Sequence, residues 1–238
     1  SIPPIAFTFW RWAIACGIFL LVFGIRTWKQ RDHFLKAWKF IILFSLISIS
    51  GFNAVFYIAL QKSTALQVCL IQSILPVLVL LLGLIILRER INKRQCWGVV
   101  FSVSGAAIIV LRGDLDVLST LSLSEGDLWA LLAVFLWACQ AFLMRWKPQN
   151  IEIMPFMTVI SFLGVIALIP FYLWETSTIA PMPINRTSII YVLYVAILAS
   201  VIGTSCWNEG TYRAGGARAG YFGNLFPVFA GALAIIIL

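Results

Sequence analysis

The sequence predicts an all-α integral membrane protein, a polytopic helix bundle, and three observations support this fold class. The 238-residue chain is 62% hydrophobic and 11% charged, whereas soluble domains are about half apolar and a quarter charged. The apolar residues fall in runs of roughly 16 to 23 residues, the length that a helix needs to cross the core of a bilayer. No run alternates with a period of two, so a transmembrane β-barrel is excluded.

Eight membrane-spanning helices are predicted from these runs. They cover residues 5–25, 38–60, 65–87, 96–111, 128–144, 154–174, 189–212 and 217–238. Most connections between them are short, so helices that follow one another in the chain are expected to be antiparallel neighbours. Residues 112–127 are predicted to form an extracytoplasmic linker.

Basic residues predict how the helices are oriented. Thirteen Lys and Arg residues lie in one set of alternate connections, and three lie in the other set beside five acidic residues. The larger set is Arg26, Lys29, Arg31, Lys36, Lys39, Arg88, Arg90, Lys93, Arg94, Arg145, Lys147, Arg213 and Arg218. The smaller set is Lys62, Arg112 and Arg186, with Asp114, Asp116, Glu125, Asp127 and Glu175. Because cytoplasmic loops are enriched in Lys and Arg, loops 26–37, 88–95, 145–153 and 213–218 are predicted to be cytoplasmic. These loop charges also account for the net charge of +8, so no nucleic-acid partner is inferred.

A shift of 151 residues aligns the chain with itself. Under this shift three pairs of residues coincide: Pro4 and Pro155, Pro76 and Pro227, and Lys62 and Arg213. The helix after Pro4 is predicted to start outside and the helix after Pro155 inside, so the two copies are inverted and each needs an odd number of spans. We therefore expect a 5+5 inverted repeat with units at 1–111 and 128–238. Its first and last helices would lie before the first residue and after the last residue of this sequence.

Short motifs occur in a characteristic order along the chain. They include Pro3-Pro4-Ile5-Ala6-Phe7, Phe9-Trp10-Arg11-Trp12, Leu87-Arg88-Glu89-Arg90, Gly126-Asp127, Trp207-Asn208, Gly216-Ala217 and Pro227-Val228. In this order and spacing the whole chain resembles the drug/metabolite transporter superfamily, specifically the EamA-type permeases with two inverted five-helix repeats. The resemblance implies secondary transport of small metabolites, commonly export through the plasma (inner) membrane, without a bound cofactor. The two missing helices, and a glutamate that the family carries after its ninth helix, are departures from that pattern.

Two ionisable residues within the predicted spans are candidates for function, since such groups are costly inside a membrane. Arg11 lies about 9 Å into the first span at the rise of an α-helix. It could bind an anionic group of a substrate, such as a carboxylate, or it could pair with another helix or extend toward the interface. Glu209 precedes Arg213 by four residues and is interpreted as its intrahelical ion-pair partner. The alternative is a carboxylate that couples transport to protons.

A substrate cavity is predicted between the two copies, where transporters with inverted repeats bind their substrates. Its candidate residues are Arg11, Asn53, Tyr57, Gln72, Trp137, Gln140, Trp207, Asn208, Tyr212 and Asn224. Tyr57 and Asn208 coincide under the shift, and aromatic rings with a few amides suit an amphipathic small molecule. Helix–helix hydrogen bonds or interface anchors are the alternative roles of these residues. Pro76 and Pro227 are predicted hinges because proline interrupts the hydrogen bonds of a helix, although a tolerated kink is the alternative.

Other patterns exclude functions or indicate packing. The five cysteines are single and His33 stands alone, so neither a metal site nor a disulfide framework is expected. Gly98, Ser102 and Ala106 form a stripe of small residues that predicts close helix packing, and such faces also allow a homodimer.

The sequence therefore favours a secondary transporter that moves amino acids or related amphipathic compounds by alternating access, with a small molecule and the lipid bilayer as its partners. A nucleotide-sugar or organophosphate antiporter is an alternative, but it would need a cluster of basic residues in the membrane, where only Arg11 is central. An integral membrane enzyme acting on lipid-linked substrates is a second alternative. It would need grouped acids, histidines or metal ligands, and the sequence shows none.

Overall fold

The computed structural model describes residues 3–88, 92–110, 124–179, 181–223 and 225. Every regular element in these ranges is a helix, which confirms the predicted all-α class. Six helices of this part of the chain, counted through short π-helical, 3₁₀-helical or turn segments, are long and apolar enough to cross a membrane. They are Pro4–Lys29, Trp38–Lys62, Gln67–Leu87, Glu125–Trp146, Ile153–Thr178 and Arg186–Ala214.

The first half of the chain forms three of these spans and one further helix. Its elements are α1 (Pro4–Lys29), α2 (Arg31–Lys36), α3 (Trp38–Ser45), the π-helical segment η1 (Leu46–Gly51), α4 (Phe52–Lys62), α5 (Ala65–Gln72), α6 (Leu75–Leu87) and α7 (Lys93–Val110). Helix α1 begins with Pro4, where the missing N–H costs nothing. Helix α5 begins after Thr64, whose side chain accepts a hydrogen bond from the N–H of Gln67.

The second half begins with a capped helix. Its elements are α9 (Glu125–Leu143), the 3₁₀ turn η2 (Met144–Trp146), α10 (Ile153–Thr178), α11 (Arg186–Tyr194), the π-helical segment η3 (Val195–Gly203), α12 (Thr204–Ala214) and α13 (Gly216–Gly223). Ser124 and Asp127 form a capping box at the start of α9, each side chain accepting a hydrogen bond from the backbone N–H of the other. This reciprocal pair satisfies two N–H groups that the helix leaves open.

The predicted spans and the observed helices differ mainly at their ends. The capping box starts α9 at Glu125 rather than at residue 128. Helix α10 continues to Thr178, so Glu175 lies within it and is 1% exposed; the prediction that Glu175 is a loop charge is wrong. The span predicted at 96–111 corresponds to α7. The structure does not describe the side chains of Ser102 and Ala106 in this helix, so the predicted stripe of small residues stays a prediction. Most of the span predicted at 217–238 also lies outside the described residues.

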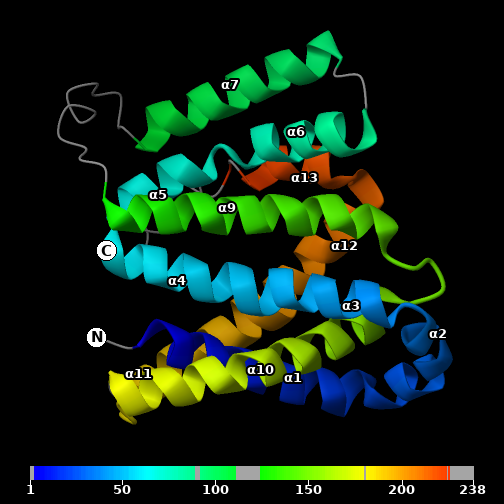
Figure 1. Cartoon of the computed structure of the whole chain (residues 1–238), viewed down its shortest axis with the longest axis vertical. Helices are drawn as coiled ribbons and strands as arrows, with labels where there is room; N and C mark the ends of the chain where they lie inside the picture. Colours follow the sequence, from blue (N-terminus) through cyan, green and yellow to red (C-terminus); the bar gives the residue numbers. More distant parts are fainter. Residues whose placement is uncertain (1–2, 89–91, 111–123, 180, 224, 226–238) are drawn as a thin grey trace.

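Helices α1 and α10 form an antiparallel pair at one side of the bundle (Figure 1). The carboxylate of Glu175, near the end of α10, accepts hydrogen bonds from the N–H groups of Ile5 (3.1 Å) and Ala6 (2.7 Å) at the start of α1. At the opposite end, the side-chain oxygen of Gln30 accepts one from the N–H of Glu152, just before α10 (3.1 Å). Each helix thus supplies a cap for the first turn of the other, where backbone N–H groups have no partner within their own helix.

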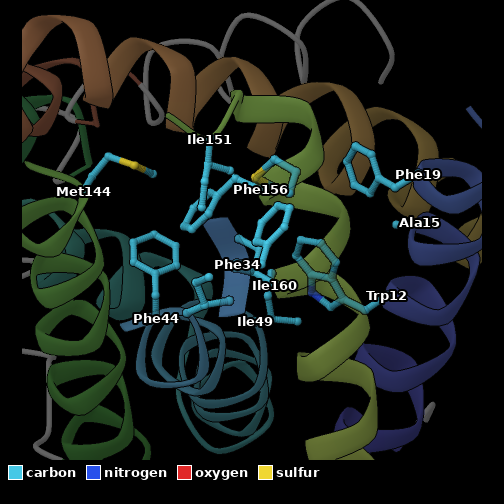
Figure 2. Packing of buried hydrophobic residues seen from close by; sticks show 12 residues of the cluster. Trp12, Ala15, Phe19, Phe34, Phe44, Ile49, Met144, Ile151, Phe156 and Ile160 are labelled. Carbon is cyan, nitrogen blue, oxygen red and sulfur yellow. The ribbon is translucent and has the colours of Figure 1, made fainter. Parts of the chain in front are cut away.

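The largest core cluster lies where α1, α3, η1 and α10 meet. Figure 2 shows the rings of Phe34, Phe44 and Phe156 grouped beside Ile49, with Trp12 entering from α1. Phe44 and Phe156 are in edge contact at 5.1 Å between ring centres. A Cβ atom on Gly164 would lie 2.4 Å from a side-chain carbon of Ile49, so α10 approaches η1 as closely as a glycine permits. This contact fixes the position of η1 against α10.

Two of the long spans contain a π-helical segment, η1 between α3 and α4 and η3 between α11 and α12. A glycine ends each segment. A Cβ on Gly51 would lie 2.9 Å from the carbonyl oxygen of Leu46, and one on Gly203 would lie 3.1 Å from that of Leu198. Both carbonyls belong to the residue five positions earlier, which is the spacing of the π-helical hydrogen bond. The π-helical register therefore brings a backbone carbonyl oxygen so close to residues 51 and 203 that glycine is favoured at both positions.

The 151-residue shift also relates these elements in space. It moves 46–51 to 197–202, within η3, and it moves Ala65, the first residue of α5, to Gly216, the first residue of α13. Helices related by the shift run in opposite directions: α1 is antiparallel to α10, and α5 and α6 are antiparallel to α13 (Figure 1). This geometry is consistent with inverted copies. The number of five helices in each copy stays a prediction.

Pro76 lies beside an interruption of the third span. Helix α5 ends at Gln72, a turn follows at Ser73 and Ile74, and Pro76 is the second residue of α6. Because proline cannot donate a backbone hydrogen bond, the interruption of the helix lies next to Pro76, as the sequence predicts. A hinge motion at Pro76 remains a prediction, and Pro227 lies outside the described residues.

Replacing Glu175 by alanine should destabilise the protein. The change would leave the N–H groups of Ile5 and Ala6 without their acceptor in a buried place, at a cost of about 1–3 kcal/mol. We expect a clear fall in the melting temperature of the purified protein in detergent. The matched control is Glu152→Ala at the other end of α10, where the side chain is exposed. Equal melting temperatures for the two variants would show that the cap contributes little.

Candidate functional site

A cavity of about 790 Å³ lies between α1, α4, α5, α9, α12 and the two π-helical segments. Its volume is within the range of sites that hold drug-sized molecules. The lining draws residues from both halves of the chain and is polar at some points and aromatic at others. The polar residues are Arg11, Ser48, Asn53, Tyr57, Gln72, Gln140 and Thr204, and the others are Trp12, Phe52, Phe56, Trp137, Val195, Ala199, Gly203, Cys206 and Trp207.

Seven of the ten predicted cavity residues contribute to this lining. They are Arg11, Asn53, Tyr57, Gln72, Trp137, Gln140 and Trp207. Asn208 is 1% exposed and lies behind the lining, where its side-chain oxygen accepts a hydrogen bond from Gln140 (3.1 Å). Tyr212 packs beside the core cluster instead. Asn224 lies outside the described residues.

Arg11 is held inside the cavity wall by two side chains of α4. It is 6% exposed. Its Nη1 donates a hydrogen bond to the hydroxyl of Tyr57 (2.9 Å) and its Nη2 donates to the side-chain oxygen of Asn53. The guanidinium carbon also lies 5.4 Å from the ring centre of Trp12 and 5.3 Å from that of Tyr57, distances at which a cation is attracted to an aromatic face. Among the described residues no carboxylate forms an ion pair with Arg11.

Asn53 connects Arg11 to the π-helical segment η1. While its side-chain oxygen accepts from Arg11, its side-chain nitrogen donates to the carbonyls of Ser48 (2.8 Å) and Ile49 (2.9 Å). Thr204, which coincides with Asn53 under the 151-residue shift, donates its hydroxyl to the carbonyl of Ala199 (3.0 Å). Ala199 coincides in turn with Ser48. Both π-helical segments therefore have a side-chain donor at the same place, five residues after the carbonyl that it serves.

Aromatic rings form the wall toward α9 and α12. Trp137 and Trp207 lie 5.1 Å apart between ring centres, and Phe52 lies 5.4 Å from Trp137. Such tilted contacts are favourable for aromatic pairs. The rings give the cavity an apolar surface in addition to its polar residues.

Three ionisable residues lie outside the cavity lining: Glu209 and Arg213, near the C-terminal end of the span 186–214, and Lys147, which follows η2. Glu209 and Arg213 form an ion pair one helical turn apart, which confirms the intrahelical pair expected from their spacing. Lys147, which the loop pattern counts among the cytoplasmic charges, is 4% exposed. Its Nζ donates to the carbonyls of Pro148 (3.2 Å) and Ile151 and lies 4.4 Å from the ring centre of Tyr212. Burial lowers the pKa of Lys147, and the charge of Glu209 acts in the opposite direction.

Several lining residues were not anticipated from the sequence, among them Trp12, Ser48, Phe52 and Thr204. Phe52 and Thr204 directly follow the two π-helical segments, which change the helical register in a way that no residue pattern in the sequence marks in advance. In the described part of the chain, no three His, Cys, Asp or Glu side chains are grouped so as to hold a metal ion.

The chain matches the EamA-like transporter family over residues 1–111 and 124–238. It belongs to this family. Together with the six apolar helices, membership makes the chain a multi-pass integral membrane protein.

Relatives of this EamA-family protein are named as transporters. It is 27% identical over 221 residues to the uncharacterized transporter YyaM of Bacillus subtilis (strain 168), a match that covers 92% of this chain and 72% of the relative. It is 25% identical over 167 residues to a probable amino-acid metabolite efflux pump of Salmonella typhimurium (strain LT2), covering 66% of this chain and 54% of that protein. A protein of known crystal structure has the same fold, with a TM-score of 0.77 at 15% identity over 99% of this chain and 79% of the other.

Replacing Asn53 by leucine should destabilise the EamA-family protein. The variant would remove the side-chain donor from two carbonyls of η1 and a hydrogen-bond partner from Arg11, and each buried polar group left unpaired costs about 1–3 kcal/mol. We expect a lower melting temperature in detergent than for the wild type. Asn150→Leu, in an exposed loop, is the matched control. If both variants melt like the wild type, Asn53 does not support the π-helical segment.

Proposed function

We propose that this EamA-family protein is a secondary transporter that exports small amphipathic metabolites, such as amino acids, across the cytoplasmic membrane by alternating access. The observation that carries the proposal is the cavity of about 790 Å³ inside the helix bundle. Its lining combines aromatic rings, side-chain amides and a single charged residue within the described lining, Arg11. A molecule with one anionic group and an apolar body fits this surface.

The distribution of basic residues supports the proposed orientation. The end of the bundle at which α1 finishes carries Arg26, Lys29 and Arg31, and it is the proposed cytoplasmic end because cytoplasmic loops are rich in such residues. The related protein of Salmonella typhimurium is named a probable amino-acid metabolite efflux pump. That name supports amino acids and their derivatives as the first compounds to test here, and export as the direction.

The architecture also supports alternating access. Helices α1 and α10 are adjacent, antiparallel and related by the 151-residue shift (Figure 1). The spans that line the cavity contain the interruption at Pro76 and the two π-helical segments, which are places where a helix can bend. Two inverted halves that tilt against each other would open the same cavity first to one side of the membrane and then to the other.

Purified protein should be stabilised by its substrate, because a ligand that binds only the folded state raises the melting temperature. We expect a thermal-shift screen of amino acids, nucleosides and polyamines to identify amino acids or their amphipathic derivatives. The compounds that raise the melting temperature would then be tested for flux in liposomes, with and without an imposed ion gradient. Flux without a gradient would indicate a uniporter. If no stabilising compound is carried by the reconstituted protein, the transport proposal is wrong.

Alternating access also predicts that Cys206, which lines the cavity, can be modified from either face of the membrane. In a variant that keeps Cys206 as its only cysteine, a membrane-impermeant thiol reagent added to one face or the other should react. The substrate should slow both reactions. A matched variant that keeps only Cys16, which is buried at 5% exposure and does not line the cavity, should react from neither face. Reaction of Cys206 from one face alone, under all conditions, would contradict alternating access.

A further inference from the structure

Several hydrogen-bond donors of the cavity wall have no partner among the described residues. Three buried atoms on lining residues are in this state: the Nε of Arg11, the Nε1 of Trp12 and the hydroxyl oxygen of Ser48. Arginine Nε and tryptophan Nε1 can only donate, and a hydroxyl can donate as well. Each of the three is therefore a buried donor that the described residues leave unsatisfied.

The positive charge of Arg11 is also without a counter-ion in the described part of the chain. Its two partners, Tyr57 and Asn53, are neutral. A buried charge is costly unless it is paired and hydrogen-bonded, and the two aromatic rings beside the guanidinium offset only part of that cost. The cavity therefore holds a positive charge at one place and none of opposite sign among its described lining residues.

The same two partners fix the plane of the guanidinium. Tyr57 takes one N–H of Nη1 and Asn53 takes one of Nη2, and Asn53 is itself tied to the carbonyls of Ser48 and Ile49. A guanidinium held in this way keeps further N–H groups for a ligand, and its fork matches the two oxygens of a carboxylate. Arg11 is thus held in place before any ligand arrives, which limits the entropy lost on binding.

Another part of the cavity lining is aromatic. The ring centre of Trp137 lies 5.4 Å from that of Phe52 and 5.1 Å from that of Trp207. A ligand bound to Arg11 by its anionic group would place the rest of its body against these rings. Aromatic or other apolar bodies gain most from such a surface.

We infer that Arg11 is the anchor for one carboxylate group of the substrate, and that the transported class is monocarboxylates with an apolar or aromatic body. This inference rests on the proposed function and narrows its substrate. A phosphate ester, which carries nearly two charges at neutral pH, would place a second negative charge where the described lining offers no second cation. The site therefore selects a single anionic group.

The test uses probes that differ only in their polar end. They are 3-phenylpropanoate, its neutral amide 3-phenylpropanamide, and 2-phenylethyl phosphate, each titrated against the purified full chain by calorimetry. Because a charge-assisted hydrogen bond is about twice as strong as a neutral one, we expect the carboxylate to bind at least tenfold more tightly than the amide. It should also bind more tightly than 2-phenylethyl phosphate. Equal affinities for acid and amide, no binding of the acid at millimolar concentration, or tighter binding of the phosphate would overturn the inference.

Variants then assign the preference to Arg11. In Arg11→Gln the acid and the amide should bind with affinities within about twofold of each other, a free-energy difference near zero. Arg11→Lys should keep part of the preference, because it retains the charge and loses the fork. Arg26→Gln makes the same chemical change on the same helix at an exposed position and should keep the full preference. A preference that survives in Arg11→Gln would place the anion site elsewhere.

Liposome flux separates the anion site from the transport function. A carboxylate that binds with the expected preference and is not carried would leave the role of Arg11 standing and refute transport. An amide carried as fast as the acid by the wild type would leave transport standing and refute the carboxylate anchor. If Arg11→Gln does not fold, the three probes on the wild-type protein still decide the substrate class, and Arg11→Lys still tests the residue.

Discussion

The hydrogen-bonding needs of two π-helical segments determine the form of the site. In the hydrocarbon core of a membrane little water is available to a backbone carbonyl, so a donor from the protein stabilises the carbonyls of an irregular turn. Asn53 meets this need in η1 and Thr204 meets it in η3. Because Asn53 has a second function, accepting a hydrogen bond from Arg11, the irregular turn and the buried cation depend on the same side chain.

Mutual support between related elements recurs elsewhere in the fold. Helices α1 and α10 each cap the start of the other, through Glu175 at one end and Gln30 at the other. One cap is a carboxylate and the other an amide, so the two ends are alike in position and different in chemistry. The close contact of Gly164 with Ile49 then joins this pair to η1. Residues of α1 and η1 in turn line the cavity.

The sequence predicts the six membrane-crossing helices of the described residues and seven of the sixteen residues that line the cavity, for physical reasons. Long apolar runs and the positions of basic residues define membrane helices. Polar residues such as Asn53 and Gln140 within those runs are costly unless they have partners, so they can be identified as candidate site residues from the sequence. Trp12 and Ser48 were missed because an aromatic residue or a serine in an apolar run is ordinary. Glu175 was misplaced because charge alone favours a loop, and only the start of α1, distant in the chain, gives that carboxylate its buried partners.

The glycines that end η1 and η3 limit how the sequence of this protein can change. A π-helical turn holds one more residue than an α-helical turn, so losing it would rotate everything that follows by about 100° around the helix axis. A side chain at Gly51 or Gly203 would meet a carbonyl five residues earlier. This contact would destabilise the π-helical turn relative to an α-helical one. Asn53 would then leave Arg11, and Thr204 would leave the cavity. An insertion or deletion of one residue nearby would have the same effect, so the phase of these two helices is a property that any functional descendant of this chain must keep.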